Sequence, residues 1–190
     1  MSRATGTKRA ILDAALELAA TRGITGTTMD DVAELAHVAK GSLYYNFSSK
    51  DKLFEALLEE GVGSLSDSLR AARDGLHGSE ALVALIAVLL DLIESNAGLA
   101  KLMAAEIFRT DRAWQKTLFA LRHEALAVFA EAIAEARPAT AAAGTSGLMA
   151  SSVFGAVLMA GLEWLVFDPD RDRDEVSAAI LESLSGGLLA

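Results

Sequence analysis

The chain has 190 residues, no cysteine and a formal net charge of −9 at pH 7, with 52% hydrophobic residues and a mean hydropathy of +0.33. The absence of cysteine excludes disulfides, thiolate nucleophiles and thiolate metal sites. Aromatic residues make up only 6% and there are 2 prolines, a balance that favours helix over strand. We expect an all-α fold of about nine helices, judged from the helical spacing of the apolar residues.

Three short helices are predicted at the N-terminus, over about residues 7–21, 28–36 and 39–47. Gly23 follows the first helix at a position typical of a helix end. Thr28 stands at the start of the second helix, and Asp31 lies three residues after Thr28, which is the spacing of a capping box. The short turn between the second and third helices predicts an N-terminal helix-turn-helix domain over residues 1–50.

The third predicted helix has two chemically different faces. Leu43 and Phe47 form its apolar side, whereas the opposite side is polar, aromatic and positively charged at its start. A short polar helix held on a small apolar bundle suits insertion into the major groove of DNA. The residues on this side are Lys40, Ser42, Tyr44, Tyr45 and Asn46.

The acidic charge of the chain is unevenly distributed. Residues 1–52 hold seven basic and six acidic side chains, whereas the other residues hold 10 basic and 20 acidic ones. Distant acidic groups are screened beyond about 8 Å at physiological salt, so they do not exclude contact between the N-terminal part and phosphates. The net charge of residues 1–52 is only +1, so general attraction to DNA should be weak. We therefore expect the affinity for DNA to depend on a few well-placed contacts and on dimerisation.

The remaining residues, 51–190, predict a larger helical domain. Its helices are expected over about residues 50–73, from Ser79 through the apolar run 81–90, from Thr110 or Asp111 to about 136, over 148–167 and over 173–184, with a break at Gly98 and a loop over 138–147.

One apolar segment has an alternative interpretation. Residues 138–162 carry no charge, and this length is enough to span a bilayer, which takes about 20 residues. Its first third resembles a loop, Ser151 and Ser152 interrupt the apolar part, and Glu163 follows at once. We therefore expect a buried helix of a soluble protein and no contact with membranes.

A set of N-terminal residues resembles the DNA-binding domain of the tetracycline-repressor (TetR) family. The resemblance covers about a quarter of the chain, from Ile11 to about Leu57, and its spacing and identities are far more specific than a helix-turn-helix period alone. The matching residues are Ala14, Ala15, Leu18, Gly23, Thr27, Thr28, Val32, Ala33, Ala36, Val38, Lys40, Gly41, Ser42, Leu43, Tyr44, Tyr45, Phe47, Lys50 and Leu53.

The resemblance implies a homodimeric transcriptional regulator, most simply a repressor, that binds a palindromic operator and is released by a small molecule. The residues it implies at the DNA are Thr27, Thr28, Lys40, Gly41, Ser42, Tyr44, Tyr45, Asn46 and Lys50.

Four residues depart from the usual family pattern: Asn46 stands where histidine is common, Ser48 stands where proline is common, and His37 and Ala39 are the other two. His37 stands where many members have glycine, so the turn requires a positive φ from histidine. Ala39 replaces the usual serine or threonine cap of the third helix, which removes a capping bond of about 1 kcal/mol.

The same resemblance implies a dimer interface and an effector pocket in the C-terminal helices. The expected interface residues are Leu148, Ser152, Gly155, Leu158, Leu162, Leu165, Val176, Ala179, Ile180, Ser183 and Leu184. The candidate effector contacts are Met103, Phe108, Trp114, Phe119, His123, Phe154, Met159, Glu163 and Trp164, many of which would be core residues in any helical bundle.

Two rival functions compete with this interpretation. An enzyme is disfavoured because the three histidines are isolated and no phosphate loop or nucleophile elbow is present. A helical ligand- or partner-binding module that has lost DNA affinity stays open because the N-terminal part is only weakly basic. We expect no cofactor and no metal, and, since the first nine residues contain no apolar run, a cytoplasmic protein without a signal peptide.

Overall fold

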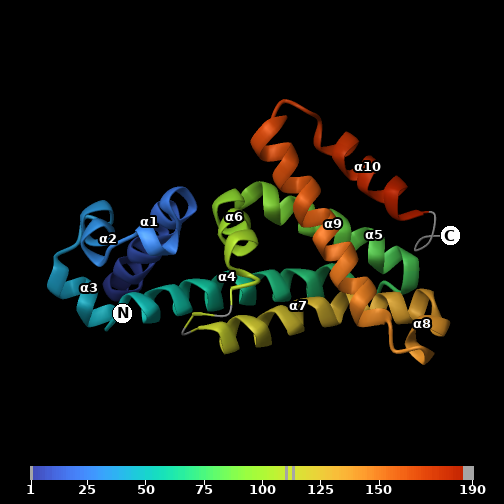
Figure 1. Ribbon diagram of the computed structural model, residues 1–190, viewed down its shortest axis with the longest axis horizontal. Helices are drawn as coiled ribbons and strands as arrows, with labels where there is room; N and C mark the ends of the chain where they lie inside the picture. Colours follow the sequence, from blue (N-terminus) through green and yellow to red (C-terminus); the bar gives the residue numbers. More distant parts are fainter. Residues whose placement is uncertain (1, 110, 113, 186–190) are drawn as a thin grey trace. The chain divides into compact units, whose positions relative to one another are not determined.

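The computed structural model describes residues 2–109, 111–112 and 114–185, and these residues form helices with no strand among them (Figure 1). The predicted all-α fold is therefore confirmed. The helices are α1 (Ser2–Gly26), α2 (Met29–Leu35), α3 (Lys40–Asn46), α4 (Lys50–Arg73), α5 (Gly78–Ser95), α6 (Ala97–Glu106), α7 (Gln115–Ala136), α8 (Pro138–Ala142), α9 (Ser146–Phe167) and α10 (Arg173–Ser185).

The chain divides into two compact units. Unit 1 contains the described residues of 1–61 and 101–119, and unit 2 contains those of 62–100 and 120–190. Each unit therefore combines segments that are far apart in the sequence, and α4, α6 and α7 have residues in both. The predicted domain boundary after residue 50 stays a prediction.

The first three helices of unit 1 lie where the sequence predicted them. Helix α1 extends further at both ends than expected, but Gly23 has φ 71° and ψ 164°, which interrupts the helical geometry at the predicted stop. Ile11 and Ala15 of α1 are fully buried, and so is Val32 of α2. This apolar centre supports α3 through the buried side chain of Leu43.

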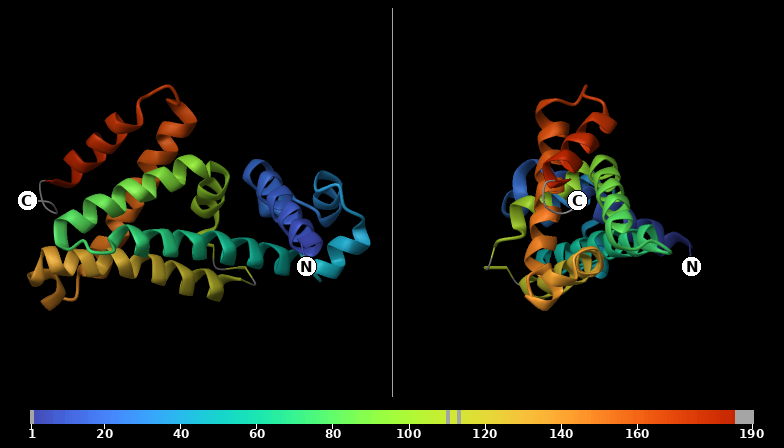
Figure 2. Two further views of the ribbon diagram at one scale, coloured as in Figure 1. Left: turned by 180° about the vertical axis from the view of Figure 1, so that it is seen from behind. Right: turned by 90° about the vertical axis from the view of Figure 1, so that its right-hand side faces the viewer.

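Unit 2 is built on an apolar contact between α5 and α9, with α10 packed against both (Figure 2). The buried residues of α5 recur every three or four positions, which is the pattern of a helix with one side in the core. Gly161 permits close approach of α9, because an added Cβ there would lie 3.0 Å from Cγ2 of Ile93 and 3.3 Å from Cδ1 of Leu90. Ion pairing between Arg173 and Asp91 attaches α10 to α5.

Several predicted boundaries were wrong. Helix α5 begins at Gly78 with His77 at its N-cap, not at Ser79. The break before α6 lies at Asn96, and Gly98 is inside α6, since glycine costs only about 1 kcal/mol in a helix whose other residues favour it. Helix α7 begins at Gln115; of the two predicted starts, Asp111 lies before the helix and Thr110 lies outside the described residues.

The predicted loop over residues 138–147 contains the short helix α8. Pro138 is its first residue, a position where the fixed φ of proline and its missing N–H are both compatible with a helix. The chain then turns through Gly144, which has φ 69°, and α9 begins at Ser146.

Helix α9 is long and apolar enough to cross a membrane by length and composition alone. However, 33% of its most apolar window is buried inside unit 2, and Glu163 lies on its exposed side. Its packing against α5 and α10 buries one side only, so the helix that was expected to be buried is partly exposed among the described residues.

Candidate nucleic-acid interface

A capping box fixes the start of α2. The Oγ1 of Thr28 accepts a hydrogen bond from the backbone N–H of Asp31 at 3.1 Å, and the Asp31 carboxylate accepts one from the backbone N–H of Thr28 at 3.3 Å. The hydrogen bonds from Thr28, with a smaller contribution from Arg22, lower the pKa of Asp31 below its usual value. The capping box predicted from the sequence is therefore confirmed.

The turn between α2 and α3 has the geometry that the sequence required. His37 adopts φ 53°, and its N–H donates to the carbonyl of Glu34 at 3.1 Å. The N–H of Val38 donates to the carbonyl of Ala33 at 3.0 Å. Helix α3 then begins after Ala39, which provides no side-chain cap, as expected.

Helix α3 has one buried side and one exposed side. Leu43 is fully buried and Phe47 is 5% exposed, so they attach the helix to the core of unit 1. Tyr44 is 50% exposed and Tyr45 is 91% exposed, and an added Cβ at Gly41 would meet no atom within 4 Å. This side therefore leaves two aromatic rings and an open stretch of backbone accessible to a partner.

The polar residues of the interface already have partners within unit 1. Lys40 Nζ lies 2.7 Å from a carboxylate oxygen of Asp30, and Lys50 Nζ donates to the carbonyl of Thr25 at 3.2 Å. Asn46 donates its side-chain amide to the carbonyl of Ser42 at 2.8 Å, within the same helix. A DNA phosphate or base would therefore share or replace these contacts.

Thr27 is a correction to the predicted set of DNA contacts. Its side chain is 1% exposed, and its Oγ1 donates to the carbonyl of Gly23 at 2.9 Å. This bond holds the segment between the Gly23 kink and α2, so Thr27 acts inside the protein and its side chain is not available to DNA. Thr28, next to it, is exposed.

A second segment of unit 1, residues 101–119, contacts the chain just before α2, and no pattern in the sequence indicates this contact. Arg112 forms a two-pronged ion pair with Glu106, at 2.8 and 3.0 Å, and also donates to Oγ1 of Thr25 at 3.2 Å. Glu106 is 5% exposed, so this carboxylate is buried against its guanidinium partner. Thr25 is thus held by two cations, Lys50 at its carbonyl and Arg112 at its hydroxyl.

Comparison with known proteins agrees with this geometry. The model of the family "Bacterial regulatory proteins, tetR family" matches residues 11–57. The chain is 32% identical over 92 residues to the HTH-type transcriptional repressor KstR2 of Rhodococcus jostii (strain RHA1), covering 48% of this chain and 45% of that protein. It is 44% identical over 48 residues to IcaR, the negative transcriptional regulator of the biofilm operon icaADBC of Staphylococcus aureus, covering 25% of this chain and 26% of that protein. The matched stretches thus span less than half the length of these curated relatives.

Solved structures match over nearly the whole chain. A putative fatty acid metabolism regulator of Clostridium perfringens is 26% identical, with a TM-score of 0.79 and coverage of 93% of this chain and 97% of that one. Residues 11–57 therefore form a DNA-binding domain of the TetR family. Two more distant structures share the TetR fold: FadR of Bacillus subtilis in complex with stearoyl-CoA (21% identical, TM-score 0.77, 94% and 98% covered) and AibR in complex with isovaleryl coenzyme A and operator DNA (20% identical, TM-score 0.76, 96% and 98% covered).

The candidate effector contacts do not gather in one described site. Met103, Phe108, Trp114 and Phe119 belong to unit 1, whereas the other candidates belong to unit 2. Trp114 is 2% exposed and packs on Phe54 with ring centroids 6.2 Å apart, and Arg112 lies over its ring. Trp114 is therefore a core residue of unit 1, although its indole N–H has no partner among the described residues. Phe108 is 85% exposed.

In unit 2 the structure gives the remaining candidates different surroundings. Trp164 is 6% exposed, and its indole N–H donates to the carbonyl of Arg171 at 2.9 Å. This hydrogen bond attaches the loop between α9 and α10 to α9. Phe154 meets Phe129 edge-on, with centroids 6.1 Å apart. Met159 and Glu163 are exposed, so their side chains do not line the interior of the described unit.

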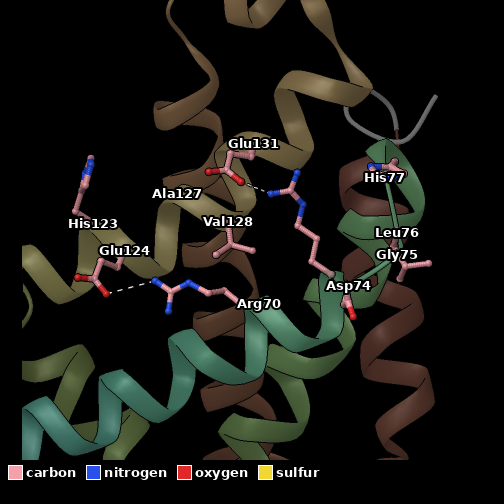
Figure 3. A pocket seen from close by; sticks show the side chains of 11 residues that line it. Arg70, Asp74, Gly75, Leu76, His77, His123, Glu124, Ala127, Val128 and Glu131 are labelled. Carbon is pink, nitrogen blue, oxygen red and sulfur yellow. Dashed lines mark hydrogen bonds and ion pairs between the residues drawn. The ribbon is translucent and has the colours of Figure 1, made fainter.

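His123 lies at a surface pocket of unit 2 with a volume of about 500 Å³ (Figure 3). Both arginines of the pocket are paired with carboxylates, Arg70 with Glu124 at 3.4 Å and Arg73 with Glu131. The backbone N–H of Gly78, together with Arg73, holds the pKa of nearby Glu135 below its usual value. Because both guanidinium groups already have carboxylate partners, an anionic ligand would have to displace these partners to bind here.

The predicted dimer residues divide into buried and exposed sets. Leu158, Val176 and Ile180 are at most 9% exposed and belong to the core of unit 2. Gly155, Leu162, Leu165 and Leu184 are half-buried. The remaining predicted residues are exposed: Leu148 and Ser152 in α9, and Ala179 and Ser183 in α10. Leu148 and Ser152 lie on one helical stripe of α9 that also contains Met159, Glu163 and Phe167.

Proposed function

We propose that the protein is a homodimeric transcriptional repressor that binds a palindromic operator and is released from it by a small molecule. The observation that carries this proposal is α3, a short helix buried through Leu43 and Phe47 that exposes Tyr44, Tyr45 and Gly41. Its place after a capped α2 and a tight turn is the geometry of a helix that enters the major groove. We expect the protein to act in the cytoplasm and not as an enzyme.

The exposed stripe of α9 supports self-association. It places Leu148 (72% exposed), Met159 (62%) and Phe167 (74%) on one side of a helix whose other side packs on α5. Three large exposed apolar side chains on one side of a helix are typical of an interaction site, and a two-fold contact between copies of α9 and α10 would cover them together with the polar Ser152 and Glu163 between them. Two reading helices related by this axis would require half-sites about one helical turn, or a multiple of it, apart.

Substitution in the α9 stripe tests the dimer. We expect Met159→Glu to weaken self-association at least about a hundredfold, because it buries an unpaired charge in an apolar interface. Sedimentation velocity at micromolar concentration measures the change. Val83→Glu, at a residue of α5 that is 41% exposed, is the matched control and should leave the oligomeric state unchanged. A wild-type protein that sediments as a monomer contradicts the two-fold operator.

Selection of bound duplexes from a random DNA library tests DNA binding, palindromy and half-site spacing together. We expect a palindromic operator, and we expect Lys40→Ala and Tyr44→Ala to lower operator affinity by at least about tenfold without unfolding the protein. Lys116→Ala, which removes the same charge from an exposed position of α7, is the control. Failure of the wild-type protein to enrich any sequence would favour a module that has lost DNA affinity.

An acyl-coenzyme A is the effector class that we propose. The support comes from the structural neighbours, which include a fatty acid metabolism regulator and two regulators solved with acyl-CoA ligands. Fluorescence anisotropy of a labelled operator, with stearoyl-CoA, isovaleryl-CoA and free coenzyme A added in parallel, measures release. We expect at least one thioester to release the operator and free coenzyme A to leave it bound; equal inactivity of both thioesters contradicts this effector class.

A further inference from the structure

Three cations of unit 1, namely Arg9, Lys40 and Lys52, lie beside carboxylates of the same unit. Arg9 lies 2.9 Å from Asp13 and 2.7 Å from Glu60, and Lys52 lies 2.6 Å from Glu55. All of these partners are at the surface or close to it. If the protein binds DNA through phosphate contacts, several of the cationic side chains in unit 1 are already neutralised by carboxylates before DNA binds.

Lys40 is the most informative of these cations, because it begins α3. Its ammonium lies 2.7 Å from the Asp30 carboxylate, and both side chains are well exposed, at 67% and 60%. The hydrogen bond and the charge of Asp30 raise the pKa of Lys40 above its usual value. Asp30 belongs to α2, ten residues earlier in the chain, and the helix-turn-helix geometry brings the two side chains together.

Solvent-exposed ion pairs contribute little to stability, so folding alone does not require this one. Its consequence for DNA binding is larger. Each cation that neutralises a phosphate releases counterions and changes the slope of log K against log salt by about 0.9. At 0.1 M salt one such contact corresponds to about an eightfold change in affinity. A lysine that stays paired with a neighbouring carboxylate makes no such contribution.

We propose that Asp30 is a specificity-determining residue, which masks Lys40 on arbitrary DNA and gives it up to a phosphate only at the operator. This inference rests on the proposed DNA-binding function. At a non-specific site nothing holds α3 close to the duplex, and Lys40 stays with Asp30. At the operator, base contacts of α3 bring the ammonium within reach of the backbone, and the phosphate replaces the carboxylate.

Asp30→Asn is the variant that tests the mask. The amide has nearly the shape of the carboxylate but does not neutralise the lysine. Affinities for a random-sequence duplex and for the selected operator are measured at salt concentrations from about 0.05 to about 0.3 M, which include the physiological concentration. For each DNA-bound subunit, we expect the random-duplex slope to steepen by up to about 0.9 and the affinity at 0.1 M to rise by up to about fivefold, because an exposed ion pair holds the lysine only weakly. Operator affinity should change no more than it does in a control variant that removes one carboxylate charge from the same helix, because wild-type Lys40 already contacts phosphate there.

Glu34→Gln provides the matched control. Glu34 lies on the same helix, is exposed, and forms no ion pair with any described residue. The substitution removes the same charge without releasing a lysine, so it should shift both affinities equally and leave both slopes unchanged. In a Lys40→Ala background, Asp30→Asn should then behave like Glu34→Gln, because no lysine remains to unmask. Thermal unfolding of each variant checks that the fold is retained.

The outcomes separate this inference from the function on which it rests. A selective gain on random duplex that disappears in the Lys40→Ala background supports the mask. If Asp30→Asn and Glu34→Gln behave equally while the wild-type protein binds its operator, Asp30 does not keep Lys40 from phosphates on random DNA. The proposed function as a DNA-binding regulator is then unaffected. Absence of DNA binding in every protein at the lowest salt overturns both.

Discussion

The surroundings of α2 in unit 1 and the contact between α5 and α9 in unit 2 are stabilised by different chemistry. In unit 1 the parts around α2 and α3 are joined by directional contacts: a capping box, the ion pair of Glu106 with Arg112, and hydrogen bonds to Thr25. In unit 2 the contact of α5 with α9 is apolar and depends on the absence of a side chain at Gly161. Directional contacts fix how a binding surface is oriented, whereas apolar packing fixes only how closely two helices approach.

The largest expected effect concerns the buried ion pair of unit 1. Glu106→Ala should lower the free energy of unfolding by about 3 kcal/mol, because it leaves the Arg112 guanidinium, which is 16% exposed, without its carboxylate partner. Chemical denaturation measures the loss. Asp111→Ala removes a carboxylate that pairs with Arg109 at an exposed position and should change stability very little. Equal losses in both variants would show that the buried pair has no special importance.

The apolar contact of unit 2 provides the next test. Gly161→Ala should destabilise the protein by about 1–3 kcal/mol, since the new methyl group overlaps the side chains of Ile93 and Leu90. Gly147→Ala, at a glycine of α9 where an added Cβ meets nothing within 4 Å, is the control in thermal unfolding. A Gly161→Ala protein as stable as the control would mean that Ile93 and Leu90 repack at no cost.

The cap of α2 should have the smallest effect. Thr28→Ala should cost about 1 kcal/mol at pH 7 by removing the acceptor of the Asp31 N–H. Because the folded state lowers the pKa of Asp31, its carboxylate stabilises the fold above the unfolded pKa near 3.8. This contribution disappears as the pH falls through the lower folded value. Urea denaturation from pH 7 to about pH 2.5 should therefore show a shallower acid loss in Asp31→Asn than in wild type, and parallel curves would contradict the assignment.

Local features of unit 1 were readable from the sequence because their parts are close in the chain. Thr28 and Asp31 are three residues apart, and the turn at His37 joins two short helices, so both follow from spacing and backbone sterics. The contact of Arg112 with Thr25 spans 87 residues, and no local pattern records it.

The aromatic residues of the C-terminal helices show the complementary limit. An aromatic residue in an apolar helix has the same sequence pattern whether it lines a ligand pocket or packs in a core. In the structure Trp114 packs on Phe54, sixty positions earlier, and Trp164 donates to the carbonyl of Arg171 beyond the helix end, so the contacts of both come from distant parts of the sequence. Only the tertiary structure distinguishes the two cases.

The return of residues 101–119 into unit 1 has a consequence for engineering and for evolution. A segment exchanged between relatives at residue 61 would separate Phe54 from Trp114, Glu55 from Thr117 and Thr25 from Arg112. Such a chimera would expose an unmatched aromatic face and lose two hydrogen bonds, even though it carries every residue expected at the DNA. Unit 1 is made of two separate segments, residues 1–61 and 101–119, so an exchange of unit 1 between relatives has to move both segments together.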